Sequence, residues 1–283
     1  MSGGKRGRIL VLSENTAGGT GLLAEHGLSF WIEYGGRRIL FDTGQGMVLL
    51  HNAARLGVPL DTVDAIVLSH GHYDHTGGLK DVLNVANGPE IYAHPAAFAP
   101  KYACSPSGSP RDIGIPNLDE QTVRAKSTLV LTDGPTDVFP GVRVTGPVPR
   151  TNEYEDTGGR FFRDAACSKP DTFPDDQALY LEAGDGLVVV LGCAHAGVIN
   201  TLKHIQQLTN GKPVHTLMGG MHLVSANPER LDRTVRDLRA FGIRRLLPAH
   251  CTGFPAMARL MHEFPAQYGQ CHVGTVVEIE NAE

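Results

Sequence analysis

The sequence has no long hydrophobic run. Residues 1–19 carry a few positive charges, but their one apolar stretch is residues 9–12, after which polar residues return. That stretch is too short for the hydrophobic core of a secretory signal. No later segment is long enough to cross a bilayer. We therefore expect no export signal, no membrane partner and a cytoplasmic location.

Blocks of consecutive basic residues are also missing, and the formal net charge is -5. A groove for the phosphate backbone of nucleic acid needs clustered Lys and Arg, so nucleic acid is not an expected partner. The glycine-rich segment TAGGTG, residues 16–21, fits neither the P-loop nor the dinucleotide-binding pattern. We interpret it as a loop without a phosphate-binding role.

Paired cysteines are missing as well. The five cysteines are odd in number and widely spaced, and no CxxC pair occurs. This pattern predicts neither a disulfide framework nor a thiolate zinc knot, and it favours a reducing compartment. Two of the cysteines flank histidines, and we predict packing roles for them because buried cysteines at strand ends usually pack. These two are Cys193 and Cys251.

The rest of the composition is that of an ordinary globular protein. Of the 283 residues, 41% are hydrophobic and 19% are charged, so the chain can bury a full core. We predict one domain over residues 1–283. Irregular segments at about 100–117 and 147–176 are expected to form loops that shape a pocket.

A histidine cluster follows a short apolar strand at residues 65–68. The stretch VLSHGHYDHTGGL, residues 67–79, contains His70, His72, Asp74 and His75. Three imidazoles and a carboxylate this close together would crowd one another unless a metal ion gathered them. The cluster therefore predicts a metal site.

Three later strands also end in a histidine, at His195, His222 and His250. Strands and helices alternate in this last third of the chain, which indicates a layered α/β fold. In such folds the carboxyl ends of the strands collect ligands at one edge of the sheet. We therefore expect these residues to meet in one site, whose candidate metal ligands are His70, His72, Asp74, His75, His195, His222 and His250.

Seven candidate ligands suffice for two divalent ions. Side chains two residues apart in an extended segment can lean to the same side, so we assign His70, His72 and His195 to one ion. We assign Asp74, His75 and His250 to the other. A water or hydroxide held between the ions would have a lowered pKa and would serve as a nucleophile without Ser or Cys. Zinc is the favoured metal, with manganese and iron as alternatives.

The motif HGHYDH resembles the HxHxDH signature of the metallo-β-lactamase superfamily, and ILFDTG at residues 39–44 resembles its early strand. The resemblance covers nearly the whole chain. It implies a four-layer αββα sandwich in which Asp42 supports the metal loop. Tyr73 lies between the candidate ligands, where it would either donate a hydrogen bond to a substrate or pack.

Further strings narrow the resemblance to one branch of that superfamily. They are EHGLSFWIE, LFDTGQG, DDQAL, GCAHAGVINTL, GGMHL and PAHCTG. Together they resemble the branch named for 7,8-dihydropterin-6-methyl-4-(β-D-ribofuranosyl)-aminobenzene-5′-phosphate synthase. This branch implies a small phosphorylated pterin or aminobenzene riboside as substrate. His26, in the first of these strings, would line the substrate pocket.

The sequence departs from the wider superfamily at residues 219–222, which read GGMH where most members have a metal-bridging Asp. A neutral imidazole cannot bridge two cations as a carboxylate can. His222 therefore either binds one ion or stands beside the site as a hydrogen-bonding or acid–base group. The second ion would be held more weakly.

We expect a metal-dependent hydrolase or lyase-like synthase, with Asp74 and His222 as the candidate catalytic residues. An alternative is a phosphodiesterase that acts on another phosphate ester. A di-iron redox protein is a second alternative, but those proteins usually carry a carboxylate where this chain has His72. A non-catalytic scaffold would be expected to have lost ligands, and the six main ones are present. A true β-lactamase is disfavoured because such enzymes are exported. The oligomeric state is left open.

Overall fold

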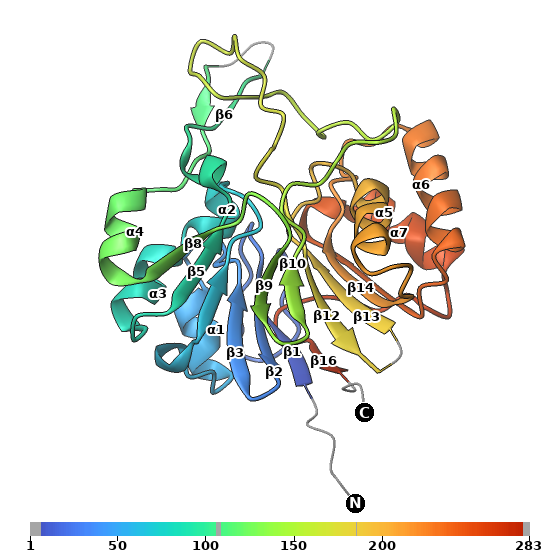
Figure 1. Cartoon of the computed structure of the whole chain (residues 1–283). Helices are drawn as coiled ribbons and strands as arrows, with labels where there is room; N and C mark the ends of the chain where they lie inside the picture. Colours follow the sequence, from blue (N-terminus) through green and yellow to red (C-terminus); the bar gives the residue numbers. More distant parts are fainter. Residues whose placement is uncertain (1–6, 106–108, 185, 280–283) are drawn as a thin grey trace, which may run out of the picture.

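The computed structural model describes residues 7–105, 109–184 and 186–279. Two main β-sheets lie face to face, and helices cover the outer face of each (Figure 1). Within the described ranges no helix has the length and apolar character needed to cross a membrane.

The first sheet has seven strands in the order β16-β1-β2-β3-β4-β5-β8. Strands β3, β4, β5 and β8 run parallel, whereas β16, β1, β2 and β3 are linked by antiparallel pairs. The strand bounds are β1 Gly7–Ser13, β2 Ser29–Tyr34, β3 Arg37–Phe41, β4 Ala65–Val67, β5 Glu90–Ala93, β8 Thr128–Leu131 and β16 Val276–Ile279.

The second sheet has six strands in the order β15-β14-β13-β12-β10-β9. Here β13, β14 and β15 run parallel, so their carboxyl ends meet at one edge. Their apolar residues form nearly continuous runs, as expected for strands buried on both faces. The bounds are β9 Thr136–Phe139, β10 Val142–Val144, β12 Leu179–Ala183, β13 Gly186–Leu191, β14 Val214–Gly220 and β15 Arg245–Ala249.

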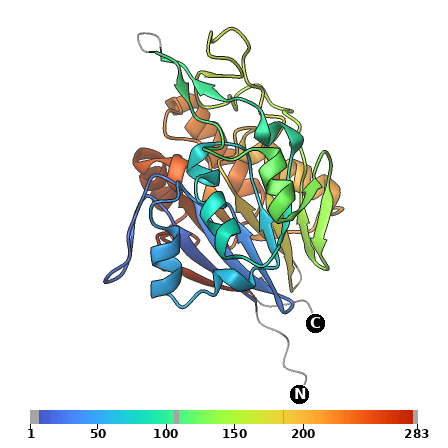
Figure 2. The ribbon, with the colours of Figure 1, turned by 90° about the vertical axis from the view of Figure 1, so that its left-hand side faces the viewer.

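The core has three apolar layers. One layer lies between the sheets and includes Phe30, Phe41 and Val190. A second packs the helices against the first sheet around Trp31, and a third packs the remaining helices against the second sheet around Leu202. Figure 2 shows the helices in front of the first sheet. The predicted four-layer αββα sandwich is thereby confirmed.

The helices fall into two groups that match these layers (Figure 1). Helices α1 Leu49–Arg55, α3 Leu79–Val85 and α4 Glu120–Lys126 lie on the first sheet, and α5 Val198–Leu208, α6 Pro228–Ala240 and α7 Phe254–Glu263 lie on the second. Short helical turns occur at α2 Tyr73–Thr76, η1 Leu60–Thr62, η2 Pro95–Phe98 and η3 His250–Thr252.

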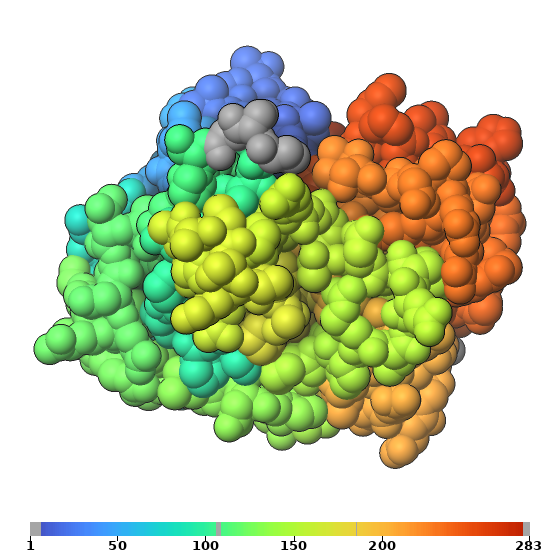
Figure 3. Space-filling view, turned by 90° about the horizontal axis from the view of Figure 1, so that it is seen from above, coloured from blue at the N-terminus to red at the C-terminus, as the bar shows by residue number. Residues whose placement is uncertain are grey.

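A small third sheet stands above the sandwich, within the two segments expected to be irregular. Its strands are β6 Tyr102–Ala103, β7 Arg111–Asp112 and β11 Phe161–Phe162, in the order β11-β6-β7. Seen from above, the segment at 147–176, coloured yellow-green to yellow, spreads across the middle of the molecule (Figure 3). We call residues 100–105, 109–117 and 147–176 the cap.

The cap contains a disulfide, so the prediction that the cysteines form no disulfide framework is wrong for one pair. Cys104 and Cys167 form a disulfide that joins the two cap segments across 63 residues of sequence. The prediction failed because distance along the chain does not report distance in space, and β6 pairs with β11 beside this bond. The disulfide also removes the observation that favoured a reducing compartment.

A two-residue break divides the helical segment after the histidine loop into α2 and α3. Gly77 and Gly78 separate the two, and both approach the backbone closely. A Cβ at Gly77 would lie 2.2 Å from the carbonyl oxygen of Gln45, and one at Gly78 would lie 2.4 Å from that of Thr43. These contacts hold the histidine loop against the turn after β3.

Candidate metal centre

The histidine loop begins directly after β4, and its candidate ligands are buried. His70, His72, Asp74 and His75 are between 0% and 7% exposed. Gly71 is required between the first two because an added Cβ would lie 2.0 Å from the carbonyl oxygen of Ala97. The loop can therefore turn its side chains inward only with glycine at this position.

The structure brings His70, His72 and His195 together as predicted. Their ligand atoms lie within 4.8 Å of one another. Within the described part of the chain, the Nε2 atoms of all three are buried and have no hydrogen-bond partner. Burying such atoms without a partner is costly, and a bound cation would remove that cost.

Neighbouring groups fix the tautomers of two of these histidines. The Nδ1 of His195 lies 3.0 Å from the carbonyl oxygen of Thr157, to which it must donate. Ser69 Oγ donates to Asp42 Oδ2 at 2.6 Å, so it accepts from His70 Nδ1 at 2.9 Å. In both neutral rings Nε2 therefore presents a lone pair to the site, as a metal ligand requires.

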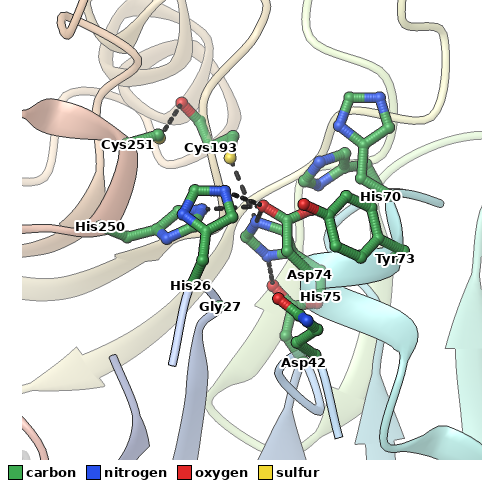
Figure 4. A network of polar contacts seen from close by, with 12 residues as sticks. His26, Gly27, Asp42, His70, Tyr73, Asp74, His75, Cys193, His250 and Cys251 are labelled. Atoms are coloured by element: carbon green, nitrogen blue, oxygen red, sulfur yellow. Dashed lines mark hydrogen bonds and ion pairs between the residues drawn. The ribbon is translucent and has the colours of Figure 1, made fainter. Parts of the chain in front are cut away.

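The second predicted set, Asp74, His75 and His250, is more dispersed. Asp74 Oδ2 lies 3.2 Å from His250 Nε2 and 3.9 Å from His75 Nε2. It also lies 3.3 Å from Nε2 of the half-exposed His26, which is therefore a further candidate ligand (Figure 4). The ligand atoms of His26, Asp74 and His250 form one cluster within 4.8 Å.

The contact between Asp74 and His250 also suits a cation. Asn15 Oδ1 lies 2.8 Å from His250 Nδ1 and also accepts the Gly27 N–H at 3.4 Å, so His250 donates from Nδ1. In the neutral ring the Nε2 lone pair then faces a carboxylate oxygen. Two acceptors this close repel each other unless a proton or a metal ion lies between them.

Burial and charge shift the pKa values across the site. Burial and the surrounding imidazoles hold the pKa of His70 and of His195 well below the usual range. Burial opposes charge on Asp74, but His75, His250 and His26 outweigh it and hold its pKa well below the usual range. Burial also opposes charge on His75, yet Asp42 and Asp74 raise its pKa to about 9.

These pKa shifts give the two sets of ligands different preferences for a proton. The raised pKa of His75 favours a proton on its ring, which offsets part of the negative charge of Asp42 and Asp74 beside it. His70 and His195 remain neutral with their lone pairs available. Metal binding at His75 must therefore displace a proton.

Asp42, which the family resemblance implies as a support of the metal loop, lies beneath both sets. It is fully buried, and its carboxylate accepts from the Ser69 N–H at 2.7 Å, from Ser69 Oγ and from His75 Nδ1 at 2.7 Å. Through Ser69 it orients His70, and directly it orients His75. One carboxylate thus positions candidate ligands of both sets.

His222 lies beside His195, with ring centroids 4.3 Å apart. Its ligand atom belongs to a cluster with those of Cys193 and His195. Burial and the positive charge of Arg230 lower its pKa to about 4. The cap covers it closely, since a Cβ at Gly158 would lie 1.9 Å from His222 Nδ1. The position suits either role that the sequence left open.

A pocket of about 410 Å³ opens over these residues. Its volume is in the range of small-molecule sites. Its wall includes His26, which was expected to line a substrate pocket, and Tyr73, together with Arg111 and Phe161 from the cap. The Arg111 guanidinium lies 5.4 Å from the centroid of the Tyr73 ring.

Several residues around the site escaped the sequence analysis because they lie in the cap or far away in sequence. Phe173 stacks on His195 with centroids 3.9 Å apart. The ammonium group of buried Lys101 donates hydrogen bonds to the carboxylates of Asp171 and Asp175. Asp175 also accepts a hydrogen bond from the Gly71 N–H at 2.9 Å. Asn15, which follows β1, holds His250. Asp175 is the first residue of the branch-specific string DDQAL, residues 175–179, and that string was the one available signal for it.

Two sheets packed face to face, with a histidine cluster at one edge of the sandwich, are typical of metal-dependent enzymes of the metallo-β-lactamase type. The chain belongs to the metallo-β-lactamase superfamily, whose family model matches residues 23–250.

Two relatives cover nearly the whole chain. A 7,8-dihydropterin-6-methyl-4-(beta-D-ribofuranosyl)-aminobenzene-5′-phosphate synthase from Methanocaldococcus jannaschii is 30% identical over 282 residues, covering 96% of each chain. An uncharacterized protein from the same organism is 36% identical over 273 residues, covering 96% of this chain and all of the other. The predicted branch of the superfamily is thereby confirmed.

Solved structures agree with this assignment. Tm1679, a metal-dependent hydrolase of the beta-lactamase superfamily, is similar with a TM-score of 0.83 and 29% identity, over 97% of this chain and 100% of that one. A diphosphatase from the PhnP family has a TM-score of 0.60 at 16% identity, over 98% and 99% of the chains. The second likeness supports the fold alone.

Proposed function

We propose that this chain is a metal-dependent hydrolase or lyase-like synthase that acts on a small phosphorylated molecule. The observation that carries the proposal is the convergence of His70, His72 and His195, whose ligand nitrogens lie within 4.8 Å of one another and whose Nε2 atoms are buried. These atoms lack hydrogen-bond partners among the described residues. Three imidazole nitrogens suit zinc, with manganese and iron as alternatives.

In this proposal His70, His72 and His195 hold one divalent ion. Asp74, His75 and His250 hold the other, and His26 or His222 completes a coordination sphere. When bound, the two ions would polarise a substrate oxygen and lower the pKa of water. The Asp74 carboxylate, whose Oδ2 faces the pocket between His26 and His250, would accept the proton released during the reaction.

The pocket wall supports an anionic substrate. Among the described residues that line it, Arg111 is the only arginine or lysine. A guanidinium binds phosphate through paired hydrogen bonds, and the adjacent Tyr73 hydroxyl, 3.5 Å from the Arg111 Nη1, would add a third donor. Phe161 offers an aromatic face on which a flat ring could pack.

The relative from M. jannaschii suggests a particular substrate. If its named activity is shared, the substrate is a phosphorylated pterin or aminobenzene riboside. A phosphodiesterase that acts on another phosphate ester is the alternative, since Arg111 and the metal site would serve any phosphate of suitable size.

The proposal is tested by incubating zinc-, manganese- and iron-loaded protein with phosphodiesters, cyclic nucleotides and a phosphorylated aminobenzene riboside with its pterin partner. Turnover of any of these by the wild type, lost in His72→Ala and kept in His262→Ala, supports the proposal. His262 is an exposed histidine and serves as the matched control. A protein that binds no metal under any loading condition would contradict it.

A further inference from the structure

Cys193 lies at the centre of the site, between the two predicted sets of ligands. It follows β13, two residues before His195, and is 2% exposed. Its Sγ lies 3.1 Å from His75 Nε2. In Figure 4 the Cys193 sulfur points toward His75, between His250 on one side and His70 on the other.

The sulfur reaches ligand atoms from several directions. It lies within 4.8 Å of those of His70 and His75 in one cluster, and of those of His195 and His222 in another. A third cluster joins it with His250 and Cys251. A packing role, which the sequence favoured, does not account for a sulfur that faces imidazole nitrogens on several sides.

The neighbouring imidazoles themselves indicate a cation beside this sulfur. The Nε2 atoms of His70 and His195 are fully buried, and in the described structure neither has a hydrogen-bond partner. The tautomers fixed by Ser69 and Thr157 leave both Nε2 lone pairs available, and each ring has a ligand nitrogen within 4.8 Å of Cys193 Sγ. A cation bound to these nitrogens would lie within reach of Sγ.

Charge balance points the same way. Among the described residues of these ligand clusters, Asp74 is the only carboxylate. Two divalent cations bring four positive charges into a buried space, and Asp74 together with Asp42 behind the imidazoles offsets only two of them. A second anionic ligand would lower the electrostatic cost of holding both ions.

A thiolate can supply that charge. Cysteine sulfur binds zinc and other borderline or soft cations, and a coordinating thiol loses its proton outright. As the sulfur–metal bond forms, the S–H bond breaks and the proton leaves to water, so no oxidant or reductant is needed.

The second cysteine beside the site is less suited to this role. Cys251 Sγ donates to the carbonyl oxygen of Cys193 at 3.7 Å, so its hydrogen is directed at the backbone. It occupies space left open by Gly220, where an added Cβ would lie 2.6 Å from the sulfur. Cys251 thus packs behind Cys193.

We infer that Cys193 is a thiolate ligand of the metal centre, placed between the two halves of the site and available to both ions. This inference rests on the proposed function, since it requires a bound metal ion.

The test uses cobalt as a spectroscopic substitute for zinc. Metal-free full-length protein is loaded with Co²⁺, and bound cobalt is counted while the near-ultraviolet and visible spectra are recorded. We expect a thiolate-to-cobalt charge-transfer band in the wild type. The band should be lost in Cys193→Ser and kept in Cys251→Ala. It should also be kept in Cys271→Ala, which changes a buried free cysteine outside the ligand clusters.

The wild type alone also decides the question if Cys193→Ser does not fold. X-ray absorption of the zinc-loaded protein should show a sulfur neighbour at about 2.3 Å. Bound cobalt with visible absorption but without the charge-transfer band would overturn the inference and leave the proposed function standing. A band that survives in Cys193→Ser and disappears in Cys251→Ala would assign the ligand to Cys251 and overturn it too. Failure to bind any metal would overturn both proposals.

Discussion

The two halves of the candidate metal centre differ in how their polar atoms are engaged. Around His70, His72 and His195, the described structure leaves three buried Nε2 atoms without partners. Around Asp74, by contrast, His26 and His250 both lie within 3.3 Å of the carboxylate.

The difference shows what a metal ion would have to displace in each half. In the first half the three ligand nitrogens lie close together and the Nε2 atoms are buried without partners, so binding costs little rearrangement. In the second half the His75 ring has a raised pKa and must lose a proton to bind a metal, and the Asp74 carboxylate already lies against His26 and His250. We therefore expect the first half to bind metal more tightly than the second.

The largest effect is expected from removing a ligand of the tight half. His72→Ala should lower metal affinity and turnover by more than about 100-fold, beyond the range usual for residues that only support a ligand. Metal content by plasma mass spectrometry and turnover of the best substrate measure this. An unchanged metal content in His72→Ala, beside an unchanged His262→Ala control, would show that His72 is not a ligand.

Removing the charge of Asp74, in the second half, should lower the metal content less than His72→Ala does. Asp74→Asn keeps the shape of the side chain but removes its charge, so it should lose the weaker ion and keep the tighter one. About one ion per chain should remain, while turnover falls by roughly 100-fold because a catalytic ion and a proton acceptor are both lost. Loss of both ions would show that the halves are coupled.

Asp42 supports both halves, so a change at Asp42 should weaken the binding of both ions and reduce the difference between the halves. Asp42 has a positive φ of 56°, a conformation that asparagine also tolerates, so Asp42→Asn should keep the backbone. The amide cannot accept from both Ser69 and His75 as the carboxylate does. We expect a loss of about 10–100-fold in affinity for each ion, measured by zinc titration. An effect confined to one ion would mean that Asp42 supports only that half.

The smallest effect is expected at the pocket wall. Arg111→Gln leaves the metal halves unchanged and removes the fixed positive charge, so the KM for a phosphorylated substrate should rise about 10-fold, which is ~1.4 kcal/mol. The kcat should stay within about twofold, because the guanidinium would bind the substrate and its transition state equally. Steady-state kinetics separate the two constants. A fall in kcat at constant KM would instead place Arg111 beside the reacting atoms.

The sequence predicted the first half of the site better than the second. An HxH pair after a buried strand and a histidine shortly after β13 predict a three-imidazole cluster. Strands β4 and β13 belong to different sheets, so these residues meet because the two sheets pack face to face. In the second half, the ligand atoms of His26 also cluster with those of Asp74 and His250. His26 comes from a loop before β2, and no periodicity locates such a loop.

The conformation of the cap was even less predictable from the sequence than the second half of the site. The layered fold followed from alternating strands and helices, and it is confirmed by the structure. The disulfide between Cys104 and Cys167 and the packing of Phe173 on His195 depend on how two irregular segments meet in space. Composition identifies such segments but does not fix their conformation. The organisation of residues 1–283 as one domain stays a prediction.

The central claim, that one buried edge holds two ions of unequal affinity, is tested most directly by calorimetric titration of the metal-free protein with zinc. We predict two binding events per chain, the tighter of which disappears in His72→Ala and the weaker in Asp74→Asn. A wild type that binds no zinc, or two ions that disappear together in either variant, would contradict this account.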